Sequence, residues 1–175
     1  MRQAAIAIAA ISVVTVTLAA GQTAAPEGVR NYTRVDATTG CAGATTPAAM
    51  RGLHADGFRA VINLRLETEE GADIDASRAA AETAGLHYVH IPFDSRNPRP
   101  EVVDQFLAAV QDPANSPVLV HCATANRVGM MWLIKRVMVD GWTTARASEE
   151  AARIGLKSPQ LEAFALEYLK SHGKG

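Results

Sequence analysis

The stretch that decides the fold is PVLVHCATANRVGMMW, residues 117–132. A continuous apolar run at 117–121 ends at the histidine before Cys122, and four small or polar residues separate this cysteine from Arg127, where a second apolar segment begins. A short apolar run is typical of a strand buried on both faces, and the segment 126–141 has the length and composition of a buried helix. The sequence therefore predicts a buried strand, a tight loop and a covered helix in direct succession.

The rest of the chain continues this alternation. Further strands are predicted at 32–36, 59–65 and 87–91, and helices at 46–57, 75–85, 99–112, 143–155 and 158–171. Apolar strands that alternate with helices indicate a three-layer α/β/α fold, with a central, mainly parallel sheet covered on both faces. In such folds ligands bind at the carboxyl ends of the strands, and the loop 122–127 lies at that edge.

The first residues differ in character from the rest. A basic start, an uncharged apolar segment and small residues near position 20 form the pattern of a secretory signal peptide. We expect a signal peptide over residues 1–21, a flexible leader over 22–30 and a single domain over 31–175. The mature protein would be exported, periplasmic or secreted. A membrane anchor is the alternative, but the apolar run is marginal for spanning a bilayer and no basic cluster follows it, so we expect no stable anchor after cleavage.

The overall composition narrows the possible partners. The chain has 17 Lys and Arg against 18 Asp and Glu, for a net charge of -1, whereas nucleic-acid binders usually have a basic surplus. We therefore expect no nucleic-acid partner. The acidic segment 67–75 lacks the ordered alternation of a calcium site and is interpreted as a solvated face. His87 and His90 do not lie on one face of a strand, so we expect neither a metal nor a cofactor.

The loop between the central strand and its helix combines a nucleophile with an anion site. Backbone N–H groups converge at a helix start, and the helix dipole adds partial positive charge there. Arg127 adds a planar cation that can hold two oxygens of an oxyanion, and the small residues at 123–125 let the backbone curve around it. The same field favours the thiolate of Cys122. A structural cysteine and a solvated arginine are simpler interpretations of each residue alone, but their shared position favours function.

The segment VLVHCATANR resembles the signature loop of the cysteine-dependent tyrosine and dual-specificity phosphatases. It is more similar to the phosphatase-like domain of beta-lactamase-hydrolase-like proteins, which has a shorter loop. NYTRV, GFRAVINLR, HYVHIPFD and the closing helices follow in the order that this family shows. The resemblance implies a protein-tyrosine-phosphatase-like fold and a phosphoric monoester hydrolase acting on a phosphorylated substrate of unknown class.

The resemblance also implies a role for each residue of the site. Cys122 would attack phosphorus to form a cysteinyl-phosphate, Arg127 would bind the phosphate oxygens and the transition state, and His121 would tune the thiolate. Asp94, in IPFDSRNP, would be the general acid, since a leaving oxygen needs a proton donor. The turn-forming residues around Asp94 also fit a plain turn. The loop amides would complete the phosphate site; they belong to Ala123, Thr124, Ala125, Asn126 and Arg127.

Three features depart from the standard phosphatase pattern. The spacing is C-x4-R instead of C-x5-R, Ala125 replaces a loop glycine, and Val128 stands where many phosphatases carry a hydroxyl that helps the thiolate leave. Glycine tolerates positive φ and alanine does not, so loop geometry or turnover could suffer. C-x4-R is also the spacing of many rhodanese-type sulfurtransferases. A non-catalytic oxyanion-binding or redox-sensing domain is a third interpretation.

Two further residues leave alternatives open. Cys41 lies in TTGCAGATTP, which we expect to be a flexible, turn-rich stretch near the rim of the site. In an exported protein, a disulfide between Cys41 and Cys122 would switch the nucleophile off or protect it from overoxidation. Arg65, at the end of VINLR, either orients the substrate or the loop of the general acid, or forms a salt bridge with Glu67 or Glu69.

Overall fold

The computed structural model describes residues 24–174, and its centre is a five-stranded sheet in the order β1-β2-β5-β3-β4. β1 runs antiparallel to β2, and all other neighbours are parallel. The sheet is therefore mainly parallel, as predicted, and β5, the strand that leads to Cys122, lies at its middle. The strands are β1 (Thr33–Arg34), β2 (Thr39–Ala42), β3 (Ala60–Asn63), β4 (His87–His90) and β5 (Val118–His121).

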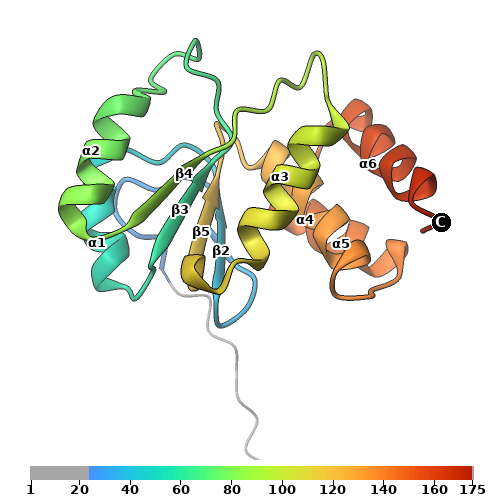
Figure 1. Ribbon diagram of the computed structural model, residues 1–175, viewed down its shortest axis with the longest axis horizontal. Helices are drawn as coiled ribbons and strands as arrows, with labels where there is room; N and C mark the ends of the chain where they lie inside the picture. Colours follow the sequence, from blue (N-terminus) through green and yellow to red (C-terminus); the bar gives the residue numbers. More distant parts are fainter. Residues whose placement is uncertain (1–23, 175) are drawn as a thin grey trace, which may run out of the picture.

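Helices cover both faces of this sheet and complete three layers (Figure 1). One face carries the 3-10 turn η1 (Pro47–Ala49), α1 (Met50–Ala55) and α2 (Ile74–Ala84). The other face carries α3 (Pro100–Gln111), α4 (Asn126–Met138), α5 (Thr144–Ile154) and α6 (Pro159–Ser171), and the 3-10 turn η2 (Pro113–Asn115) precedes β5. The predicted three-layer α/β/α architecture is confirmed.

Local signals in the sequence set several helix boundaries. The Asp73 side chain accepts a hydrogen bond from the Ala76 N–H at the start of α2, and Ser158 accepts one from the Leu161 N–H at the start of α6. Gly85 ends α2 in the left-handed conformation, with φ 81°, which glycine adopts without steric cost. These caps fix where the connecting loops begin and end.

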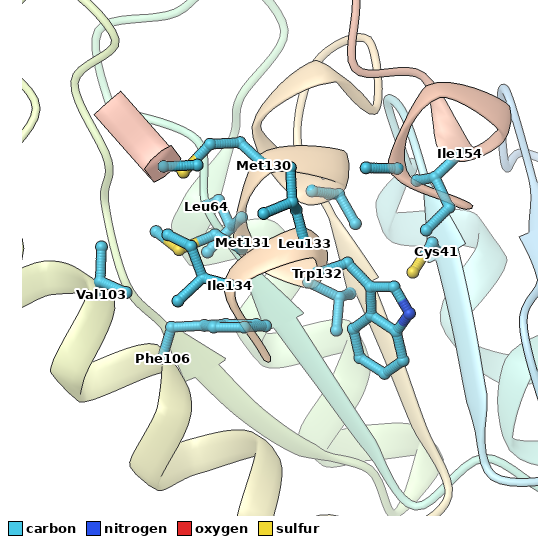
Figure 2. Close-up of a cluster of buried hydrophobic side chains, with 14 of the residues drawn as sticks. Cys41, Leu64, Val103, Phe106, Met130, Met131, Trp132, Leu133, Ile134 and Ile154 are labelled. Atoms are coloured by element: carbon cyan, nitrogen blue, oxygen red, sulfur yellow. The ribbon is translucent and has the colours of Figure 1, made fainter. Parts of the chain in front are cut away.

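The larger of two buried clusters lies between the sheet and helices α3 to α6. Helix α4 runs through it, and five consecutive side chains of this helix are fully buried: Met130, Met131, Trp132, Leu133 and Ile134 (Figure 2). Each buried side chain of this size stabilises the fold by roughly 1.5–3 kcal/mol. Because α4 is anchored in this way, the loop that precedes it is held in a fixed position.

A flexible stretch around Cys41 is the sequence-based expectation, and it is wrong. Residues 39–42 form β2, which pairs in parallel with β5 so that Cys41 lies opposite Val120. The Cys41 side chain is fully buried in the larger cluster with Trp132 and does not lie at a rim (Figure 2). Small residues in TGCA give little strand signal, and pairing on both sides overrides it. Both cysteines are free thiols, and burial raises the pKa of Cys41 well above its ordinary value.

The expected leader at 22–30 is also partly wrong. The Thr46 N–H donates a hydrogen bond to the Gly28 carbonyl at 3.0 Å, and Val29 forms an isolated bridge with Thr45. Val29 is buried in the smaller cluster, beneath α1 and α2. The folded part of the chain therefore begins a few residues before the expected boundary, because the connection after β2 offers it backbone partners.

The predicted signal peptide, residues 1–21, lies outside the residues that the structure describes. Within residues 24–174, none of the helices has the length and apolar character needed to cross a bilayer. The same part of the chain contains no group of three or more His, Cys, Asp or Glu side chains that could hold a metal ion.

Candidate active site

Three loops meet at one edge of the sheet. They follow β3, β4 and β5 and span residues 64–73, 91–99 and 122–125. The three strands are parallel and in register, so their carboxyl ends reach the same edge. A cavity of about 660 Å³ opens there, and its lining includes Glu69, Asp94, Arg96, Thr124, Asn126 and Arg127.

Cys122 lies directly beyond the end of β5 and is 1% exposed. Its N–H donates to the Ala42 carbonyl at 3.2 Å, which extends the strand pairing by one residue and fixes the start of the loop. Burial opposes the charge on Arg127, but hydrogen bonds with Glu69 and the negative charge that Cys122 carries when ionised raise the pKa of the guanidinium above its ordinary value. The thiol and the guanidinium therefore lie close together.

The carbonyls of the loop are hydrogen-bonded, whereas its amides lack backbone acceptors. The Ala123 carbonyl accepts from the Ala44 N–H at 2.9 Å, and the Thr124 carbonyl accepts from Asn31 Nδ2 at 3.4 Å. None of the N–H groups of residues 123–127 forms a close backbone hydrogen bond within the described part of the chain, although Thr124 pairs with Gly43 in an isolated antiparallel bridge. Such a set of amides at a helix start is a binding site for an anion.

Ala125, the residue before α4, has a left-handed backbone, with φ 67° and ψ −1°. A residue with a Cβ adopts this conformation at a cost of roughly 1–2 kcal/mol. The turn is held from outside by Gly155, where an added Cβ would lie 3.0 Å from the Cβ of Ala125 and 3.4 Å from the Thr124 carbonyl oxygen. The loop thus keeps the turn that a glycine would favour, and the alanine stores strain in it.

Arg127 is held by a carboxylate from the loop after β3. Its Nη1 donates to Glu69 Oε1 at 2.6 Å, and its Nη2 donates to Glu69 Oε2 at 2.8 Å. Nη1 also donates to the carbonyls of Leu64 and Phe93, at 3.0 and 3.1 Å. Two side-chain contacts and two backbone contacts therefore fix the plane of the guanidinium.

These contacts leave one edge of the guanidinium available. A guanidinium has five N–H donors, of which two belong to Nη1, two to Nη2 and one to Nε. The four hydrogen bonds of Arg127 use Nη1 and one hydrogen of Nη2. The Nε–H and the second Nη2–H remain, and they form the parallel fork that binds two oxygens of a phosphate.

Glu69 also contacts Arg65, which confirms one of the alternatives for that residue. Arg65 Nε donates to Glu69 Oε2 at 3.3 Å, and Arg65 Nη1 donates to the Gly71 carbonyl at 2.8 Å, so the loop is wrapped around the arginine. Burial would raise the pKa of Glu69, but hydrogen bonds from Arg127, the Leu66 N–H and Arg65, together with the charge of Arg127, hold it at about 2. Glu69 is therefore ionised at all physiological pH values.

Asp94 lies in the loop after β4 and lines the cavity together with Arg127. Its Oδ1 accepts from the Arg96 N–H at 2.9 Å, so the residue does form the turn that its neighbours suggested. The carbonyl of Phe93, one residue earlier, is the one that binds Arg127. The position of Asp94 is thus linked to Arg127 by the backbone carbonyl of the preceding residue. Asp94 is half-buried at the cavity wall.

His121 occupies the last position of β5 and is 1% exposed. Neither ring nitrogen has a hydrogen-bond partner among the described residues. Burial lowers the pKa of His121 to about 3, and the positive charges of Arg65 and Arg127 act in the same direction. The ring is therefore neutral at ordinary pH, so any influence on Cys122 cannot come from an imidazolium charge.

The structure brings Asp94 into one cavity with three of the predicted loop residues, Thr124, Asn126 and Arg127, whereas Cys122, Ala123 and Ala125 are not among its lining residues. The partner of Arg127 was missed, because Glu69 lies in the acidic segment that was interpreted as solvated. A signal was available: Glu69 follows a predicted parallel strand, and loops after such strands share the edge with the arginine.

Fold and site together define a class of protein. The three-layer fold carries a thiol at the end of its central strand, a tight loop and a guanidinium at the helix start, which are the parts that the resemblance to a phosphatase-like domain predicts. Residues 31–139 match the family described as "Beta-lactamase hydrolase-like protein, phosphatase-like domain", and the chain belongs to this family, as its motifs predict. None of the curated proteins compared gives a significant match.

Solved structures agree with this assignment. A protein from Shewanella putrefaciens CN-32 assigned as a phosphatase (DUF442) is 26% identical, with a TM-score of 0.70 over 85% of this chain and 93% of that one. TpbA from P. aeruginosa, in complex with pTyr, is 20% identical, with a TM-score of 0.66 over 88% of this chain and 96% of that one. The catalytic core of the PP-IP phosphatase SIW14 from S. cerevisiae is 17% identical, with a TM-score of 0.67 over 83% and 89%. The last two likenesses bear on the fold alone.

Proposed function

We propose that this chain is an exported hydrolase of phosphate monoesters that works through a cysteinyl-phosphate intermediate. The observation that carries the proposal is the proximity of Cys122 and Arg127 at a loop whose amides have no backbone acceptors. Those amides and the free Nε/Nη2 fork suit the oxygens of a tetrahedral phosphate. The family assignment supports the same chemistry.

In the first step, the Cys122 thiolate attacks phosphorus in line with the leaving oxygen. The S–P bond forms as the P–O bond breaks, and the protonated carboxyl of Asp94 gives its proton to the leaving oxygen. The Arg127 fork and the loop amides hold the three remaining oxygens as charge shifts during transfer. The amides belong to Ala123, Thr124, Ala125, Asn126 and Arg127.

In the second step, water attacks the phosphorus of the cysteinyl-phosphate. The S–P bond breaks, the electron pair returns to the Cys122 sulfur, and inorganic phosphate leaves. The Asp94 carboxylate accepts the proton of the water, which restores its acid form for the next cycle. Val128 is buried at the start of α4 and has no hydroxyl to assist departure of the thiolate, so we propose that this step limits the rate.

Val128 also favours a second candidate function, an oxyanion-binding domain with little turnover. If the intermediate hydrolyses very slowly, the same cradle binds phosphate without acting as an effective enzyme. The two candidate functions predict different steady-state rates of phosphate release, but both predict binding of phosphate or vanadate.

The experiment uses the chain from residue 24 onward, an aryl phosphate, and the variants Cys122→Ser and Cys41→Ser. The proposal predicts release of phosphate that Cys122→Ser abolishes and Cys41→Ser preserves, and a burst of phenol if hydrolysis is slow. Tight vanadate binding without phosphate release would support the second candidate. Formation of thiocyanate from thiosulfate and cyanide would instead assign a sulfurtransferase.

Export is the part of the proposal that rests on the sequence of residues 1–21 alone. Expression of the full chain in a Gram-negative host, followed by fractionation and mass spectrometry of the N-terminus, tests it. The expected result is a shortened chain in the periplasmic or extracellular fraction. A full-length chain in the cytosol would contradict it.

A further inference from the structure

A second cavity adjoins the phosphate site. It has a volume of about 520 Å³, and it shares Thr124 and Asn126 with the cavity that contains Arg127. Its remaining wall comes from β1 and the segment before it, including Tyr32, and from the last turn of α5 and the connection to α6. The two cavities therefore adjoin at Thr124 and Asn126 of the loop that follows Cys122.

The second cavity carries an unbalanced positive charge. Arg153 and Lys157 line it, no aspartate or glutamate does, and both side chains are exposed. Neither forms an ion pair with any residue between 24 and 174, although seven such pairs occur in that part of the chain. Two cations without counterions at the wall of a cavity favour an anionic ligand, and Arg153 offers the fork that suits a phosphate or carboxylate.

Arg153 lies in the last turn of α5 and Lys157 in the connection to α6, and this connection is hydrogen-bonded to the phosphate loop. Asn126 Oδ1 accepts from the Lys157 N–H at 2.9 Å and from the Ser158 N–H at 3.2 Å. Gly155 has φ 140° and packs against Ala125 so closely that an added Cβ would lie 3.0 Å from the Cβ of that residue. Arg153 and Lys157 are thus held beside the loop that would bind the reacting phosphate.

We propose that this cavity is a subsite for a second anionic group of the substrate. The inference rests on the proposed function and extends it: the preferred substrates are phosphate monoesters that carry a further phosphate in the same molecule. The ester to be cleaved binds at the Cys122 loop, and the second phosphate binds between Arg153 and Lys157. Tyr32 and the shared Thr124 and Asn126 line the path between the two phosphates.

The test compares ligands in the Cys122→Ser background, so that binding is measured without turnover. The probes are phenyl phosphate, phenyl phosphate with a second phosphate on the ring or on a two-carbon arm, and the matching carboxylates, each titrated by calorimetry. We expect the better bisphosphate to bind about 10-fold more tightly than phenyl phosphate, the effect of one charge-assisted contact. This ratio should fall to near unity in Arg153→Gln/Lys157→Gln and persist in Arg59→Gln/Lys170→Gln, which removes equal charge outside both cavities.

The outcomes separate this inference from the proposed function. Equal affinity of all probes, or a ratio that survives Arg153→Gln/Lys157→Gln, overturns the subsite even if phenyl phosphate is hydrolysed in a Cys122-dependent reaction. An equal gain from the carboxylates supports the subsite and assigns it to anions in general. Absence of hydrolysis with an intact bisphosphate ratio contradicts the proposed function and leaves the subsite supported.

Discussion

Glu69 binds Arg127 through both carboxylate oxygens, at 2.6 and 2.8 Å, from a loop 58 positions earlier in the chain. The pair sets which edge of the guanidinium faces the cavity. It also neutralises a charge that is largely removed from water, since Arg127 is 8% exposed. The carboxylate is in turn held by Arg65, so the three side chains form one continuous network.

Removal of the Glu69 charge should weaken catalysis more than it weakens folding. In Glu69→Gln, the guanidinium keeps its two backbone contacts but loses its charged partner, so its plane is less well fixed. We expect kcat/KM for an aryl phosphate to fall by about 10- to 100-fold, or roughly 1.4–2.8 kcal/mol of transition-state stabilisation. The exposed Glu67→Gln is the matched control, and an equal effect of both substitutions would contradict a positioning role for Glu69.

The strain at Ala125 makes a differential prediction for stability. Ala125→Gly and Ala123→Gly each remove one methyl group from the loop, but Ala123 is not among the described residues with positive φ. Only Ala125→Gly removes the cost of an alanine in the left-handed conformation, which is roughly 1–2 kcal/mol. The loss of the Ala125 methyl, which is better buried than that of Ala123, offsets part of this gain. We expect Ala125→Gly to be more stable than Ala123→Gly by about 1 kcal/mol in urea unfolding. The reverse order would show that the turn is not strained.

The acid role of Asp94 predicts a dependence on the leaving group. Asp94→Asn cannot donate a proton, so kcat/KM for phenyl phosphate, which reports the first step, should fall by about 100-fold. A dinitrophenol leaves without protonation, so kcat/KM for its phosphate ester should fall by less than about 10-fold in the same variant. Asn97→Ala, in the same turn, is the control for loop disturbance. Equal losses on both substrates would assign Asp94 to the turn alone.

Burial of His121 predicts a loss of stability on acidification. The folded pKa of about 3 lies below the ordinary value of 6.5, so between these values the unfolded chain binds a proton that the folded chain does not. The stability that this group contributes is complete above pH 6.5 and falls as the pH drops toward 3, by up to about 1.4 kcal/mol per pH unit.

Urea unfolding of the wild type and His121→Asn at pH 7.0, 6.0 and 5.0 measures this effect. We expect a flatter profile in the variant, whereas His54→Asn, at an exposed position, should follow the wild type. Glu69 does not act in this range, because its pKa of about 2 and its ordinary value of 4.5 both lie below it. Parallel profiles for the wild type and His121→Asn would show that the buried ring is not the source of the pH dependence.

The sequence by itself determined the order of the helices and of four of the five strands, and the loop that joins Cys122 to Arg127. These features are local: apolar runs, helix caps and a six-residue motif encode them, and they also carry the resemblance to the phosphatase family. β2 was missed because its residues are small, and its stability comes from pairing with β1 and β5 on either side, which no local pattern records.

Only the tertiary structure decided how the site is completed. Glu69 meets Arg127, and Arg153 and Lys157 meet the outer side of the same loop, because parallel strands bring distant loops to one edge and α5 packs against α4. The neutrality of His121 and the strain of Ala125 likewise depend on what surrounds them. Burial, charge neighbours and backbone angles are properties of the folded chain, so these properties could not be predicted from residue identity alone.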